Sequence, residues 1–147
     1  MEKKRVSDWL LGVMHWFLGG FLIPIAIFAA VMLITLPFVG LDENGNFVYS
    51  WMEYAFSIGF FAVGFAVTWI GARISMRLIK RKYAISNPRL ILQVSTGIFF
   101  AISAAFAAYG LLDTSAPSYA LAGAMSILDM LGQTAIFYFV TKKQLVA

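Results

Sequence analysis

The chain has 147 residues, of which 61% are hydrophobic, 16% are aromatic and only 12% are charged. Soluble domains are about 45–50% apolar and about 25% charged, so this composition excludes a soluble globular domain and predicts a membrane protein. The absence of cysteine excludes disulfide bonds and thiolate chemistry, and the single histidine excludes a metal site built on two histidines of one chain. The net charge of +4 does not indicate nucleic-acid binding, because the basic residues stand at the ends of apolar segments.

Four apolar segments are long enough to cross a hydrocarbon core of about 30 Å as helices. We place them at about 9–38, 51–73, 89–112 and 118–141. The connections between them are short, so the sequence predicts one all-α domain, a bundle of four transmembrane helices.

The first segment is longer than a bilayer requires, so it must tilt or bend. Gly19, Gly20 and Pro24 predict a bend, because proline removes a backbone donor and clashes with the preceding turn. Before the third segment, Ser86-Asn87-Pro88 predicts a helix start with a capping side chain and a first-turn proline.

The link between the first two segments contains Asn44-Gly45, a strong turn signal, which predicts a short hairpin that pairs 39–41 with 47–49. Oxygen-bearing residues in this link follow part of a calcium-loop spacing: Asp42, Asn44, Asn46 and Glu53. Phe47 stands where that loop needs glycine, so we expect no bound metal and no cofactor.

Small residues four positions apart predict close contacts between helices. They are Ala55 and Gly59, then Gly64, Thr68 and Ala72, and finally Gly97, Ala101 and Ala105.

All eleven basic residues fall on one side of the predicted membrane. They are Lys3, Lys4, Arg5, Arg73, Arg77, Lys80, Arg81, Lys82, Arg89, Lys142 and Lys143. The acidic residues of the two turns fall on the other side: Asp42, Glu43, Glu53 and Asp113. The positive-inside rule therefore predicts a bacterial inner-membrane protein with both termini in the cytoplasm.

Asp129 stands near the middle of the fourth segment, where a charged group costs about 2.5–3.5 kcal/mol and usually faces the bundle interior. Helical spacing places Ser126 and Gln133 on the same face. The third segment carries a matching polar line at Ser103, Thr96 and Gln93. Equal depth predicts that Asp129 lies near Ser103 and that Gln133 lies near Thr96 or Gln93. We call these polar residues of the third and fourth segments the polar stripe. They either hold the two helices together or form a functional polar site, and for Asp129 both interpretations remain open.

A basic group follows the second segment: Arg73, Arg77, Lys80, Arg81 and Lys82. We interpret it as lipid contact and topology, with binding of anionic lipid or of a partner's acidic surface as the functional alternative. His15 lies about one turn inside the first segment, and we interpret it as an interfacial anchor.

Four short stretches together resemble a family of bacterial four-helix inner-membrane proteins catalogued as a domain of unknown function. They are Gly19-Gly20-Phe21-Leu22-Ile23, Trp51-Met52-Glu53, Lys80-Arg81-Lys82-Tyr83 leading to Pro88, and Ile136-Phe137-Tyr138-Phe139-Val140-Thr141-Lys142-Lys143. The resemblance implies the fold and the location, and implies no activity.

The sequence predicts a non-enzymatic protein, because no second carboxylate, cysteine or histidine lies at the depth of Asp129 to complete a catalytic pair. Its partner is the lipid bilayer, and no nucleic acid is expected. The first hypothesis is a small transport- or lipid-handling protein with a polar site at Asp129. The alternative is an accessory or immunity-type protein that binds another membrane protein, or a second copy of itself, through its helix faces.

Overall fold

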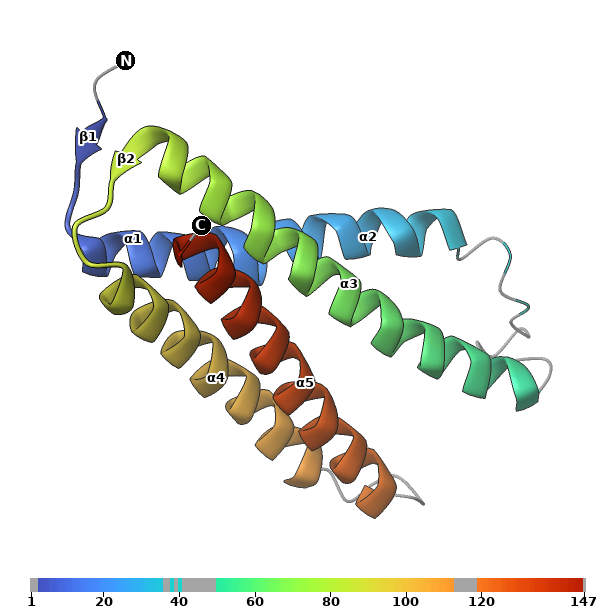
Figure 1. Cartoon of the computed structure of the whole chain (residues 1–147). Coiled ribbons are helices and arrows are strands. Elements are labelled where there is room, and N and C mark those ends of the chain that lie inside the picture. Colours follow the sequence, from blue (N-terminus) through green and yellow to red (C-terminus); the bar gives the residue numbers. More distant parts are fainter. Residues whose placement is uncertain (1–2, 36–37, 39, 41–49, 113–118, 147) are drawn as a thin grey trace.

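The structure is a computed structural model that describes residues 3–35, 38, 40, 50–112 and 119–146 (Figure 1). Its helices are α1 (Asp8–His15), η1 (Trp16–Leu22), α2 (Ile23–Thr35), α3 (Ser50–Lys82), α4 (Pro88–Leu112) and α5 (Tyr119–Val146). Two short strands, β1 (Lys4–Arg5) and β2 (Tyr83–Ala84), lie in the described part of the chain. Four helical stretches are long and apolar enough to span a membrane: Asp8–Thr35, Ile58–Lys82, Pro88–Tyr109 and Ala124–Val146. The prediction of four such helices is confirmed.

Two helices continue beyond the predicted membrane spans at the ends that carry lysine and arginine. The helix α3 continues beyond Arg73 to Lys82, and α5 continues beyond Thr141 to Val146. Cations near a helix C-terminus interact favourably with the helix dipole, which favours these extensions. The start of α4 is as predicted, because the backbone N–H of Leu90 donates to Oδ1 of Asn87 at 3.1 Å. The predicted hairpin in the first link lies outside the described residues.

The Gly-Gly stretch of the first helix forms a π-helix, η1, which ends two residues before Pro24. A π-helical turn is wider than an α-helical turn, so it accommodates a local break in the ladder of hydrogen bonds. The bend that we predicted here stays a prediction. Gly19 and Gly71 mark a close crossing of η1 and α3, because a Cβ atom on Gly71 would meet the carbonyl oxygen of Gly19.

The small-residue pattern predicts close contacts correctly at some positions and wrongly at others. A Cβ atom on Gly64 would lie 3.2 Å from Nε2 of Gln133, so that contact between α3 and α5 is real. Among the described residues, a Cβ atom on Gly59 or Gly97 would meet no heavy atom within 4 Å. At these two positions the prediction of tight helix packing is wrong.

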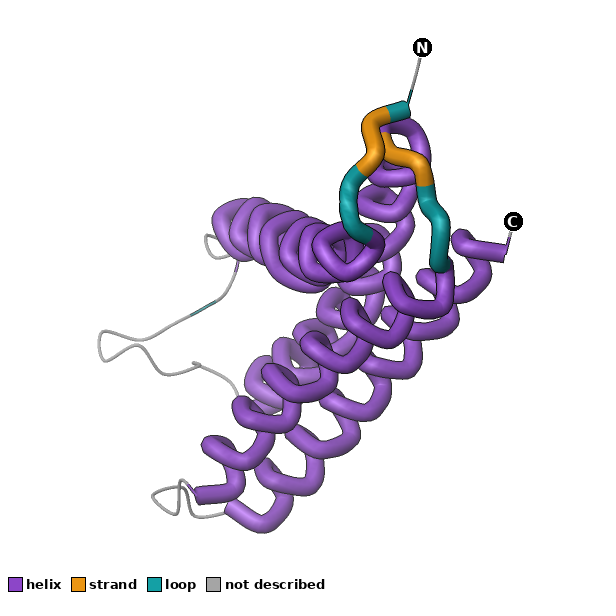
Figure 2. Tube along the Cα trace, turned by 90° about the vertical axis from the view of Figure 1, so that its left-hand side faces the viewer, coloured by secondary structure: helices purple, strands orange, loops and turns teal. Residues whose placement is uncertain are grey.

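The N-terminal segment and the α3–α4 link lie side by side (Figures 1 and 2). Strand β1 pairs in parallel with β2, with Lys4 opposite Tyr83. The carboxylate of Asp8 accepts hydrogen bonds from the backbone N–H groups of Ser86, at 3.1 Å, and Asn87, at 2.7 Å. These contacts hold the start of the chain against the link.

The end of α5 joins the same region, because Nζ of Lys80 donates to the backbone oxygen of Gln144 at 2.7 Å. We call this end of the bundle the basic end. It brings together the N-terminal segment, the last turns of α3, the first turn of α4 and the end of α5, which between them carry the lysine and arginine residues of the chain.

The buried core lies toward the basic end. One cluster contains Leu11, Met76, Ile79 and Ile91, and a second contains Ala72, Phe99 and Phe137. In contrast, α2 contributes no buried residue. Helices α4 and α5 run antiparallel side by side, α3 packs against α5, and α2 packs against α3. The α2–α3 and α4–α5 pairs diverge toward their far ends (Figure 1).

Candidate functional site

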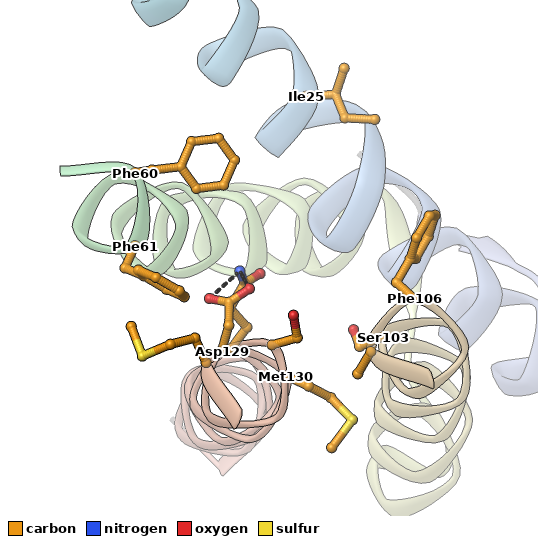
Figure 3. Close-up of a pocket in the computed structure, with 11 residues that line it drawn as sticks. Ile25, Phe60, Phe61, Ser103, Phe106, Asp129 and Met130 are labelled. Carbon is orange, nitrogen blue, oxygen red and sulfur yellow. Dashed lines mark hydrogen bonds between the residues drawn. The ribbon is translucent and has the colours of Figure 1, made fainter. Parts of the chain in front are cut away.

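A cavity of about 730 Å³ lies where the two helix pairs diverge (Figure 3). We call it the Asp129 cavity. Side chains of α2, α3, α4 and α5 line it: Ile25, Phe60, Phe61, Ser103, Phe106, Ala107, Met125, Ser126, Asp129, Met130 and Gln133. Asp129 points into this space from α5, which agrees with the orientation that its depth in the sequence predicts.

The carboxylate of Asp129 belongs to a short chain of hydrogen bonds. Nε2 of Gln133, one helical turn later on α5, donates to both carboxylate oxygens at 2.9 Å. Oε1 of Gln133 accepts from the hydroxyl of Thr68 on α3 at 3.0 Å. We call these three residues the Asp129 network. Because the amide of Gln133 is held from both sides, it orients the carboxylate toward the cavity.

The chemistry of the cavity follows from this lining. Asp129 is the one ionisable side chain among the residues that line it, and three phenylalanines and two methionines supply most of the remaining surface. A single carboxylate does not by itself define a catalytic site. It does provide an acceptor for a positively charged or hydrogen-bond-donating group whose apolar remainder lies against the aromatic rings.

The predicted polar stripe divides into two places. Ser103 and Ser126 join Asp129 and Gln133 in the Asp129 cavity. Thr96 and Gln93 lie instead in a separate groove lined by α4 and α5.

This division arises because α5 packs against both α3 and α4. Successive residues on a helix are turned by about 100°. Gln133 is bonded to Thr68 of α3, whereas the next residue, Thr134, lines the groove with Thr96 of α4. The predicted pairing of Gln133 with Thr96 or Gln93 is therefore replaced by a bond to α3.

The predicted basic group also divides. The guanidinium carbon of Arg73 lies 4.9 Å from the ring centroid of Trp69, and Lys80 is bonded to α5. Arg77, Arg81 and Lys82 are exposed. These three present the most surface to lipid headgroups or to a partner, whereas Arg73 and Lys80 are partly buried.

A second polar network surrounds His15, so our interpretation of this residue as an interfacial anchor is wrong. The side chain is fully buried. Its Nδ1 lies 2.7 Å from the hydroxyl of Ser75 on α3, and its Nε2 lies 2.8 Å from the hydroxyl of Thr141 on α5. We call these three residues the His15 network.

The hydroxyl of Ser75 also donates to the backbone oxygen of Ala72 at 3.2 Å. In that arrangement Nδ1–H donates to Ser75 and the hydroxyl of Thr141 donates to Nε2, the pattern of a neutral imidazole. The imidazole ring stacks on Phe137 with centroids 4.9 Å apart, and Phe137 stacks on Phe99 at 4.7 Å.

One signal in the sequence points to this burial. Leu11, His15 and Gly19 stand four residues apart and therefore share one helix face, and all three are buried. The sequence does not reveal which helices cover that face.

Comparisons of the chain with protein-family models, with curated proteins and with solved structures give no match. The family resemblance described above stays a prediction. Within the described residues, no group of three or more histidine, aspartate or glutamate side chains is placed to hold a metal ion.

Proposed function

We propose that the chain is an integral protein of a bacterial inner membrane that binds a small amphiphilic molecule in the Asp129 cavity, in transport or lipid handling, without catalysing a reaction. The observation that carries this proposal is the single carboxylate, that of Asp129, among the described residues of a cavity lined mostly by apolar side chains. An ionisable group at such depth costs about 2.5–3.5 kcal/mol, and packing alone does not require one.

The size and position of the cavity support binding of a small molecule. Its volume of about 730 Å³ falls within the roughly 300–1,000 Å³ of ligand pockets. Its lining comes from α2, α3, α4 and α5, so a bound molecule would lie between the α2–α3 and α4–α5 pairs. The carboxylate favours a ligand with one positive charge, and the phenylalanine rings favour an apolar body.

Binding can be tested with two probes of equal chain length, decyltrimethylammonium and 1-decanol, added to the purified protein in nanodiscs. We expect the cation to raise the melting temperature more than the alcohol does. Asp129→Asn should weaken binding of the cation by about tenfold, the loss of one hydrogen bond or ion pair to a charged group, and should leave the alcohol unaffected.

A matched control is Asp8→Asn, which removes a carboxylate at the basic end, outside the cavity. This variant should bind both probes as the wild type does. Equal binding of the cation by wild type and Asp129→Asn would refute the proposed role of Asp129.

The proposed orientation has both termini in the cytoplasm. The supporting observation is that the N-terminal segment, the α3–α4 link and the end of α5 meet at the basic end. Lysine and arginine near the ends of membrane spans favour the cytoplasmic side. Reporter fusions after Asn46 and Asp113 should be external, and fusions after Lys82 and Ala147 should be cytoplasmic. A cytoplasmic reporter at Asn46 would overturn this orientation.

The second candidate function is an accessory or immunity-type protein that binds another membrane protein. One observation favours it: α2 contributes no buried residue, and Leu33 and Ile34 near its end are 74% and 67% exposed. Such a face can bind a partner helix. Affinity purification from native membranes would distinguish the two candidates, because one stable stoichiometric partner favours the accessory function.

A further inference from the structure

A second cavity, separate from the Asp129 cavity, lies in the groove between α4 and α5. Its volume is about 580 Å³, and all of its lining residues belong to these two helices. We call it the α4–α5 groove. Because no other helix contributes to it, the groove opens on the outer face of the pair, where a membrane protein meets lipid.

The lining of the groove changes in character along α4. Arg89 stands in the first turn of the helix, at the basic end, and is exposed. Gln93 follows one turn later, Thr96 about two turns later, and Phe100 about three turns later. The order is a positive charge, then hydrogen-bonding groups, then an apolar surface. A phospholipid carries complementary parts in the same order: a negatively charged phosphate, then ester linkages, then an apolar acyl chain.

Two hydroxyl groups in the groove lack hydrogen-bond partners within the described residues. They are Oγ1 of Thr96 and Oγ1 of Thr134, one from each helix, and both are buried. An unpaired buried hydroxyl is costly in hydrocarbon, where no water is present to satisfy it. Both oxygens are closed off from the groove, so Gln93 is the polar side chain that a molecule in the groove can contact beyond Arg89.

Gly97 leaves the groove open. Within the described residues, a Cβ atom at this position would meet no heavy atom within 4 Å, so helix packing does not require glycine here. A side chain at this position would extend into the space of the groove. A second cation stands near the groove, because Nζ of Lys142 lies 5.7 Å from the ring centroid of Tyr138, which lines it.

We propose that the α4–α5 groove is a binding site for an acidic phospholipid. Arg89, with Lys142 beside it, attracts the phosphate, while the exposed side chain of Gln93 meets the ester region. The acyl chain lies over Gly97 and Phe100. Basic pockets between transmembrane helices recognise acidic headgroups in this way. The site is independent of the Asp129 cavity, with which it shares no lining residue.

The test uses the whole chain, delipidated and then offered equal amounts of phosphatidylglycerol and phosphatidylcholine with identical acyl chains. Native mass spectrometry measures the ratio of the two lipids that stay bound. We expect the wild type to retain phosphatidylglycerol preferentially. Arg89→Gln should reduce this preference about fivefold, the effect of one cation near a headgroup.

Gly97→Leu should remove the retained lipid while leaving the melting temperature of the delipidated protein unchanged. The matched control is Gly59→Leu, because Gly59 also has open space at its Cβ position but lies outside the groove. It should retain phosphatidylglycerol as the wild type does. Asp129→Asn should also leave the lipid ratio unchanged, so failure of the function proposed for Asp129 is distinguishable from failure of this site.

Two results would overturn the proposal. One is retention of the two lipids by the wild type in the ratio offered, which would identify the groove as ordinary lipid contact. The other is equal retention by Gly97→Leu and Gly59→Leu, which would place the bound lipid elsewhere on the protein.

Discussion

The His15 network and the Asp129 network both join α3 to α5, about two helical turns apart, yet their surroundings differ. The His15 network is closed. Both ring nitrogens of His15 have hydroxyl partners, the ring stacks on Phe137, and the whole side chain is buried. The Asp129 network ends in a cavity, with the carboxylate at its open end.

This difference shows that a polar residue inside a membrane helix does not indicate a binding site by itself. Depth in the helix makes both His15 and Asp129 costly. What separates them is the packing around each group, since His15 has no free face for a ligand and Asp129 has one. The closed network should therefore determine stability, and the open network should determine binding.

The largest effect is expected at Phe137, the ring that covers His15. Phe137→Ala should destabilise the protein by about 3 kcal/mol, the lower end of the range for such a truncation in a protein core. The lower end is expected because lipid is as apolar as the core, so the variant loses packing contacts but little hydrophobic free energy. Phe139→Ala is the control, since Phe139 is 63% exposed. Thermal unfolding in detergent measures both, and similar losses for the two variants would contradict the closed core.

The next effect concerns the crossing of η1 and α3 beside the His15 network. Gly71→Ala places a methyl group against the carbonyl oxygen of Gly19 and 3.0 Å from the ring of Pro24. We expect a loss of about 2 kcal/mol through overpacking. Gly59→Ala, where no atom lies within 4 Å, should be neutral or slightly stabilising, because alanine favours helix. The same unfolding assay should separate the two, and a neutral Gly71→Ala would remove the case for a tight crossing.

A direct comparison of the two networks removes one hydroxyl from each. Ser75→Ala leaves Nδ1 of His15 without its partner in a closed space, so we expect a cost near the upper value for membrane hydrogen bonds, about 1.7 kcal/mol. Thr68→Val frees Oε1 of Gln133 beside an open cavity, so a cost near the average of about 0.6 kcal/mol is expected. Equal costs would mean that the two environments do not differ.

The smallest effect is expected for Asp129→Asn. The amide oxygen of asparagine still accepts one bond from Gln133, so stability should fall by no more than about 0.6 kcal/mol. A large loss of stability would assign Asp129 to packing and would contradict its role as the open end of a binding site. Chemical denaturation gives the free energy of unfolding of this variant, and a binding measurement with decyltrimethylammonium on the same preparation gives its affinity for the cation.

The sequence determined the features that depend on local properties of the chain. Four helices follow from the length and apolar composition of four segments, and the start of α4 follows from Asn87 and Pro88. The inward orientation of Asp129 follows from the cost of exposing a carboxylate to lipid. Each of these needs only a residue, its neighbours along the helix and the thickness of the membrane.

Only the tertiary structure decided which helix faces meet. His15 is buried because α3 and α5 bring Ser75 and Thr141 to it, and Gln133 bonds to α3 although a bond to α4 was predicted. Gly97 looks like a packing glycine in the sequence but faces open space. In an apolar segment most faces look alike, because lipid and protein interiors are equally apolar. The sequence therefore does not distinguish a face that meets lipid from one that meets another helix.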